Sequence, residues 1–181
     1  MTAGSKIFWI VFLIFFILIN TAAAFIKARH IGTIRAAKKV YRNINKIENS
    51  RPGWLISYLR KIDPFVFEEL ILLAFKKNRF RIKRNRCYTH DGGIDGQVRK
   101  NGQKYLVQAK RYSDYIKKEH VQQFIKTCRH HKACGYFIHT GKTGEDTKKL
   151  LKENPQIKLI SGEKLSDFFI AKKNQSNNLF F

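Results

Sequence analysis

The chain has 181 residues, enough for one compact domain with a short appendage and too few for a second enzyme domain. Its 36 Lys and Arg residues outnumber 13 Asp and Glu, giving a net charge of +23 that predicts a polyanionic partner, either nucleic acid or anionic lipid headgroups. Three cysteines are a small, odd number that excludes a disulfide framework and fits a reducing compartment.

An uncharged apolar run extends from residue 7 to residue 26. As a helix, its 20 residues would cover the ~30 Å of a bilayer core, which predicts an N-terminal transmembrane helix within residues 1–26. The alternative is a cleaved signal peptide, because Lys6 precedes the run and Ala22-Ala23-Ala24 fits a cleavage site. Basic charge after the run favours a single-pass anchor in the inner (cytoplasmic) membrane, with the C-terminal domain in the cytoplasm.

A basic segment over residues 27–53 is predicted to form a juxtamembrane helix that ends in the linker "ENSRPG". Its charges can fix the membrane topology and touch phospholipid headgroups; the alternative is a dedicated contact with DNA. The remaining predicted boundaries are a folded domain over residues 54–172 and a polar tail over residues 173–181.

Asp63-Pro64 predicts the N-cap and first residue of a helix. The buried face of this helix is predicted at the spacing i, i+3, i+4, i+7 by Phe67, Leu70, Ile71 and Ala74. Glu68 and Glu69 lie beside that face, so at least one carboxylate can project along the edge of whatever the helix packs on.

Residues 76–86 hold seven basic residues and no acid. Phe80 and Ile82 alternate with cations, a pattern that predicts a half-buried strand with one side toward an anion. The alternative is a simply solvated basic face. The predicted nucleic-acid contacts in this cluster are Lys76, Lys77, Arg79, Arg81, Lys83, Arg84 and Arg86.

Asn101-Gly102 is a strong signal for a two-residue β-hairpin loop, and Asp91-Gly92-Gly93 is typical of a turn. With Asn101 and Gly102 as the loop, opposite partners have position numbers that sum to 203, so Asp95 faces Gln108. Alternation of side chains predicts a core face with Gly96, Val98, Tyr105, Val107 and Ala109. The opposite face is predicted to carry Asp95, Gln97, Arg99, Lys104, Gln108 and Lys110.

Opposite residues of an antiparallel pair have Cβ atoms roughly 5 Å apart, which brings Asp95 and Gln108 together. A carboxylate and an amide oxygen can ligate a hard divalent cation, while Lys110 can orient a water and Glu68 can supply a further oxygen. The alternative is an ordinary hairpin with a polar outer face.

Downstream patterns predict the element order α-β-β-β-α-β-α-β-α, hence an α/β fold with a mixed central sheet flanked by helices. The stretch from Cys128 to Cys134 contains four potential zinc ligands, but their spacing matches no usual structural zinc site. The alternative is a buried Cys128 beside solvated histidines.

From about Asp63 to Phe169, the motifs "FEEL", "DGGIDG", "YLVQAKRY", "HVQQF", "GYFIHTG" and "IKLISGEKLSDFF" resemble the Mrr-type (type IV) restriction endonuclease domain of the PD-(D/E)xK nuclease superfamily. The resemblance implies an αβββαβ core, with Glu68 as the acid on the helix and Asp95 as the principal metal ligand. Gln108 stands where most of the superfamily carries an acid, as is characteristic of the Mrr-like branch, and Lys110 matches the family's lysine.

The implied function is Mg²⁺-dependent DNA endonuclease activity, for which Mn²⁺ can substitute and no small-molecule cofactor is needed. The implied metal ligands are Glu68, Asp95, Gln108 and a backbone carbonyl near Ala109, with Lys104 and Arg111 as further phosphate contacts. Enzymes of this superfamily often act as dimers, so a homodimer is an expectation. The alternatives are a structure-selective repair or junction nuclease, and a catalytically silent, membrane-tethered DNA-binding module. Tyr88, His90 and Lys117 receive no role.

Overall fold

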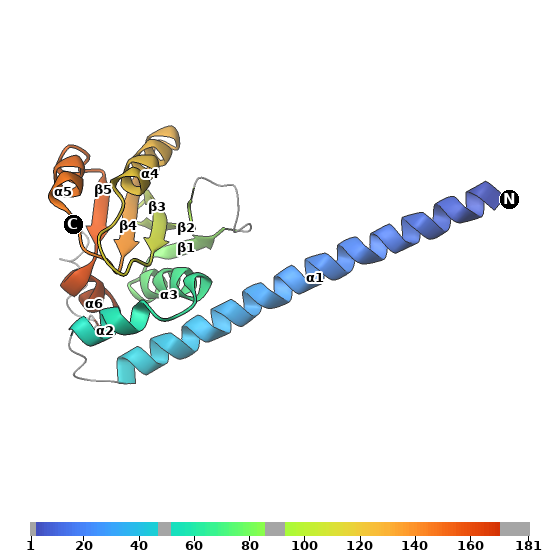
Figure 1. Ribbon diagram of the computed structural model, residues 1–181, viewed down its shortest axis with the longest axis horizontal. Coiled ribbons are helices and arrows are strands. Elements are labelled where there is room, and N and C mark those ends of the chain that lie inside the picture. The colour runs from blue at the N-terminus through green and yellow to red at the C-terminus, as the bar shows by residue number, and fades with distance from the viewer. Residues whose placement is uncertain (1–2, 47–51, 86–92, 171–181) are drawn as a thin grey trace.

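The protein is described by a computed structural model that covers residues 3–46, 52–85 and 93–170 (Figure 1). Its elements are α1 (Ala3–Lys46), α2 (Pro52–Leu59), α3 (Pro64–Lys77), β1 (Arg81–Arg84), β2 (Gly96–Lys100), β3 (Gln103–Lys110), α4 (Lys118–His130), β4 (Cys134–His139), α5 (Glu145–Lys152), β5 (Ile157–Ile160) and α6 (Gly162–Ile170). From α3 onward, this is the order that the sequence predicts.

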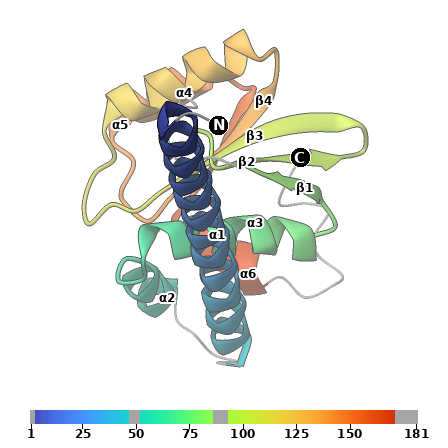
Figure 2. The same cartoon turned by 90° about the vertical axis from the view of Figure 1, so that its right-hand side faces the viewer.

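A mixed sheet forms the centre of the domain, with strand order β1-β2-β3-β4-β5. The pairs β1–β2 and β2–β3 are antiparallel, whereas β3–β4 and β4–β5 are parallel and are connected through α4 and α5. Helices α4 and α5 lie on one side of the sheet, and α3 and α6 lie on the other (Figures 1 and 2). The predicted α/β fold with a mixed sheet is confirmed.

The β2–β3 hairpin has the predicted register, from Lys100 opposite Gln103 to Gly96 opposite Val107. Asn101 and Gly102 have φ values of 51° and 79°, as a type I′ loop requires. The regular β-ladder ends at the Gly96–Val107 pair, so the predicted Asp95–Gln108 pair lies just beyond it.

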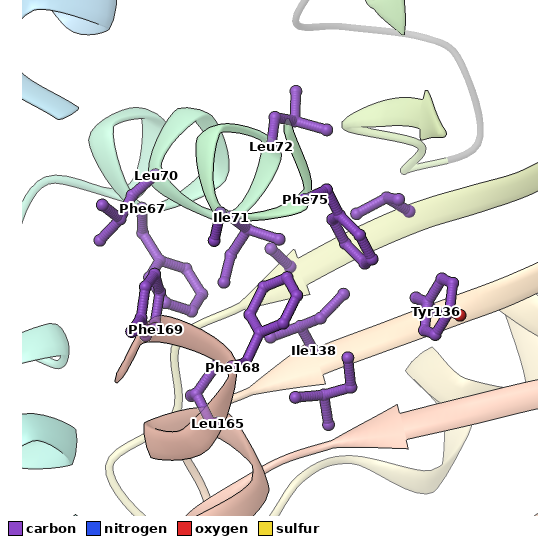
Figure 3. Close-up of a cluster of buried hydrophobic side chains, with 14 of the residues drawn as sticks. Phe67, Leu70, Ile71, Leu72, Phe75, Tyr136, Ile138, Leu165, Phe168 and Phe169 are labelled. Carbon is purple, nitrogen blue, oxygen red and sulfur yellow. The ribbon is translucent and has the colours of Figure 1, made fainter. Parts of the chain in front are cut away.

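The larger core lies between the sheet and the helices α3 and α6 (Figure 3). Aromatic rings dominate it: the Phe75 ring centroid lies 4.8 Å from that of Phe168 and 5.0 Å from that of Tyr136. A second core lies between the opposite side of the sheet and α4, where Leu106, Phe124 and Phe137 are fully buried. The central strands are therefore covered on both faces, as expected for an α/β sheet.

The second half of α1 is part of the domain. Ala37 and Ile44 are buried against the larger core, and the Tyr41 ring lies 6.4 Å from the Phe169 ring. Leu55 and Leu59 of α2 are also fully buried. The basic segment predicted from the sequence thus contributes apolar side chains to the fold.

The predicted transmembrane helix and its location in the cytoplasmic membrane are wrong. No helix within residues 3–46, 52–85 and 93–170 is long and apolar enough to cross a membrane.

Candidate active site

One pocket of about 290 Å³ collects the principal site residues that the sequence predicts. Glu68, Asp95, Gln108 and Lys110 all line it, together with Ala109. They come from three places in the chain: the first half of α3, the residue before β2, and the end of β3. The structure therefore brings together side chains separated by up to 42 positions, the interval from Glu68 to Lys110.

The start of α3 is fixed by its N-cap. The Asp63 Oδ1 atom accepts hydrogen bonds from the backbone N–H groups of Phe65, at 2.9 Å, and Val66, at 3.1 Å. Pro64 occupies the first turn, where its missing N–H costs nothing. Capping sets where the helix begins, and so places Glu68 one turn into the helix at the rim of the pocket.

The Asp95 carboxylate is held against β3. Its Oδ2 atom accepts a 2.6 Å hydrogen bond from the backbone N–H of Ala109, and its own backbone N–H donates to the Val107 carbonyl at 2.9 Å. A bond from a backbone N–H to an ionised carboxylate is a strong hydrogen bond. Asp95 is therefore positioned beside Gln108 although it lies outside the regular β-ladder.

Gln108, which lines the pocket, has a buried side-chain oxygen that the described residues leave unsatisfied. Its side chain is only 6% exposed, and its Oε1 atom is buried with no hydrogen-bond partner in the part of the chain that the structure describes. A buried oxygen without a partner costs about 1–3 kcal/mol, so it calls for an explanation. An amide oxygen beside a carboxylate fits a hard divalent cation, which prefers oxygen ligands.

Gly93 leaves the space that the Gln108 side chain occupies. A Cβ atom built on Gly93 would lie 2.3 Å from Gln108 Nε2, and the φ of Gly93 is +78°. Both the space and the left-handed backbone favour glycine. In the sequence, Gly93 is recognisable only as a turn residue, because short-range turn signals do not encode this second role.

Tyr112 and His120 form the wall next to Lys110, and sequence reasoning missed both. The Tyr112 hydroxyl lies 2.5 Å from His120 Nδ1. Burial raises the pKa of Tyr112 to about 12. Burial, followed by the Lys110 and Lys117 ammonium groups, lowers the pKa of His120. At neutral pH the pair is therefore uncharged and is joined by one hydrogen bond.

The acidic ligands of the pocket are few. Across the described ranges, no group of three or more His, Cys, Asp or Glu side chains could hold a metal ion. A cation bound here would need the Gln108 amide and backbone oxygens beside the carboxylates of Glu68 and Asp95. The same finding gives the zinc alternative near Cys128 no support, and Cys128 is fully buried.

A second pocket, of about 640 Å³, lies on the same side of the sheet as Gln108 and Lys110. Lys83 and Gln97 line it from β1 and β2 and are in register with Leu106, which is buried under α4. Because side chains alternate along β3, Gln108 and Lys110 share the face of Leu106. The pocket is completed by Lys126, Thr127 and His130 of α4 and by His131, the C-cap of that helix.

The other predicted phosphate contacts are spread over several surfaces. Arg84 is half-buried and donates to Glu69 Oε2 at 2.7 Å, and Arg111 donates to the Arg60 carbonyl at 2.8 Å, so both are engaged within the protein. Lys104 is half-buried on β3. The exposed members are Lys76, Lys77, Arg79, Arg81 and Lys83. Arg86, Tyr88 and His90 lie outside the described residues.

Residues 59–169, more than half of the chain, match the restriction endonuclease family Mrr_cat. This chain belongs to that family. The match begins at the end of α2 and closes at the end of α6, so it contains the whole sheet and every residue of the polar pocket. The Mrr-type nuclease resemblance predicted from the motifs is confirmed at this level, and domains of this kind generally use divalent metals.

Comparison with solved structures supports the fold. The MspJI restriction endonuclease, solved in complex with a 27-mer oligonucleotide, matches with a TM-score of 0.54 and 19% identity over 75% of this chain. The match covers 36% of the MspJI chain, and at this identity it shows a shared restriction-endonuclease-like fold alone. AF1548, a protein of unknown function, matches with a TM-score of 0.41 and 18% identity, over 52% of this chain and 55% of its own. A search of curated proteins found no match.

Gly93→Ala is expected to displace the Gln108 amide. Gly102→Ala is the matched control, because Gly102 has a φ of +79° but nothing within 4 Å of an added Cβ. Both variants should lose about 1 kcal/mol of unfolding free energy from backbone strain, measured by urea denaturation. Only Gly93→Ala should shift the side-chain amide NMR signals of Gln108. Unchanged Gln108 signals in Gly93→Ala would contradict the packing described here.

Proposed function

We propose that this member of the restriction endonuclease family is a divalent-metal-dependent endodeoxyribonuclease that hydrolyses phosphodiester bonds in DNA, with Mg²⁺ as the natural ion and Mn²⁺ as a substitute. The proposal depends on one observation above all. The buried Gln108 Oε1 atom lacks a protein partner within the described chain and shares a pocket with Asp95, Glu68 and Lys110. Family membership supplies the class of chemistry.

Asp95, Gln108, Glu68 and the backbone carbonyl of Ala109 would hold the ion. When bound, a divalent cation lowers the pKa of a coordinated water and polarises a phosphoryl oxygen. Gln108 contributes an oxygen without negative charge, so the two carboxylates provide the only formal charge of the ligand set. We infer that metal affinity is modest and increases when a DNA phosphate joins the site.

The chain's own residues would orient the substrate and stabilise charge. The Lys110 ammonium group would orient the attacking water and offset the negative charge that develops on the phosphorane. The Ala109 N–H keeps the Asp95 carboxylate fixed beside Gln108, so these ligands need little rearrangement. The neutral Tyr112–His120 pair would complete the wall without adding charge.

DNA is the proposed substrate class for two reasons. The MspJI endonuclease, which shares the fold, was solved with an oligonucleotide. In this chain, the basic pocket containing Lys83 and Lys126 lies on the same sheet face as Lys110, where it can contact phosphates that flank the cleaved bond. Such binding would weaken steeply with salt. A homodimer, which would place one site on each strand, stays a prediction.

The direct test is cleavage of supercoiled plasmid by the full chain with Mg²⁺ or Mn²⁺, with EDTA as the metal-free control. Asp95→Asn and Lys110→Ala should each reduce nicking by about 100-fold or more, because each removes charge from the reacting centre. Lys152→Ala, an exposed site on α5, is the matched control and should cleave normally. Equal nicking by all variants, or nicking in EDTA, would rule out this mechanism. Salt-sensitive DNA binding without cleavage by the parent chain would indicate a silent binding module.

Substitutions at Gln108 separate ligation from packing. Gln108→Glu adds a negative charge and should lower the Mg²⁺ concentration that gives half-maximal cleavage by about tenfold. Gln108→Leu removes the buried unsatisfied oxygen, so it should abolish cleavage while leaving the unfolding free energy unchanged or higher. A Gln108→Leu variant that still cleaves DNA would show that the amide oxygen has no part in metal binding.

A further inference from the structure

A basic groove of about 920 Å³ lies between α1 and α3, apart from the pocket that contains Asp95. Its cationic lining residues are Lys38, Arg42 and Lys46 from α1 and Lys76 and Lys77 from α3. All five are exposed, and no acidic residue lines the groove within the described chain. The α1 residues precede residue 59, so they lie outside the part of the chain that matches the restriction endonuclease family.

The two helices hold this groove rigidly. Near the start of α3, the Arg29 guanidinium lies 5.2 Å from the centroid of the Phe65 ring. Farther along α1, Ala37 and Ile44 are buried, and Tyr41 packs on Phe169. The contacts on both sides of Lys38 and Arg42 fix which side of α1 faces the core, so the cations keep their orientation toward the groove.

Repulsion within this row of cations disfavours folding, and a bound anion would relieve it. Lys38, Arg42 and Lys46 follow one another at intervals of four residues, and like charges at that spacing repel each other on a helix. Cations near a helix C-terminus interact favourably with the helix dipole, which accounts for Lys46, Lys76 and Lys77. It does not account for Lys38 and Arg42, which lie one to two turns before the end of α1.

The spacing identifies the kind of anion. Successive cations on α1 lie about 6 Å apart along the helix axis, and Lys38 and Lys46 lie about 12 Å apart. A nucleic-acid strand carries one phosphate per ~3.4 Å of helix axis, so about three phosphates fit along this row. A single small anion would engage only one or two of the five charges. We propose that the groove between α1 and α3 binds the sugar–phosphate backbone of a nucleic acid.

The groove would serve as a second contact beyond the proposed catalytic pocket. Lys76 follows Glu68 by eight residues, which places it about 12 Å farther along the α3 axis. This separation allows one nucleic acid to contact both places. The role of the groove in holding a DNA substrate for cleavage rests on the proposed function. Binding of the nucleic-acid sugar–phosphate backbone by the groove does not.

The test measures DNA binding in the full chain with cleavage removed. In the Asp95→Asn background with EDTA, fluorescence anisotropy follows binding to a labelled duplex of about 20 bp between about 50 and 200 mM salt. Lys38→Ala/Arg42→Ala should weaken binding at least about tenfold and reduce the salt slope by about two. Lys149→Ala/Lys152→Ala removes equal charge from exposed positions on α5 and should change affinity less than about threefold.

Thermal unfolding of each double variant shows whether a loss of affinity reflects misfolding, and a charge-retaining Lys38→Arg/Arg42→Lys variant should bind like the parent. Equal losses in the two alanine pairs would overturn the proposal, because they would reflect net charge alone. Unchanged DNA affinity in the groove variant, with groove-dependent binding to phosphatidylserine vesicles, would assign the groove to lipid instead. Because the assay contains no metal and no intact Asp95, its outcome does not depend on whether the parent cleaves DNA.

Discussion

The polar pocket depends on the hydrogen bond from the Ala109 N–H to the Asp95 carboxylate, at 2.6 Å. This bond fixes a carboxylate from the residue before β2 against the end of β3, beyond the last regular pair of the hairpin. Alternation along β3 then places Gln108 and Lys110 on one face, and Gly93 leaves room for the Gln108 amide.

Much of the domain could be predicted from the sequence, because its strongest signals are local and periodic. Asn101-Gly102 fixed the register of the β2–β3 hairpin, and the confirmed register runs to Gly96 opposite Val107. What the sequence could not supply depends on tertiary contacts. Ala37, Tyr41 and Ile44 keep helical spacing, but their basic neighbours obscured the pattern. The tertiary fold brings three residues into the pocket that no local pattern predicts: Gly93, Tyr112 and His120. The hydrogen bonds of Arg84 and Arg111 to other parts of the protein also could not be predicted from the sequence.

The charges that make up the net +23 are unevenly distributed over the domain. Among the described acidic residues, Glu69 forms an ion pair with Arg84 inside the domain. Glu68 and Asp95 line the proposed catalytic pocket. Cations gather instead in the pocket beside α4 and in the groove between α1 and α3. These two surfaces would attract a substrate whose negative charge is dispersed.

The most direct measurement of the central claim is anomalous X-ray diffraction from crystals of the full chain soaked with Mn²⁺. We expect a single strong peak within about 2.0–2.6 Å of an Asp95 carboxylate oxygen and of Gln108 Oε1, as for a hard cation bound by oxygen ligands. A Gln108 Oε1 atom that instead accepts a hydrogen bond from the protein, with no peak in the pocket at saturating Mn²⁺, would contradict it.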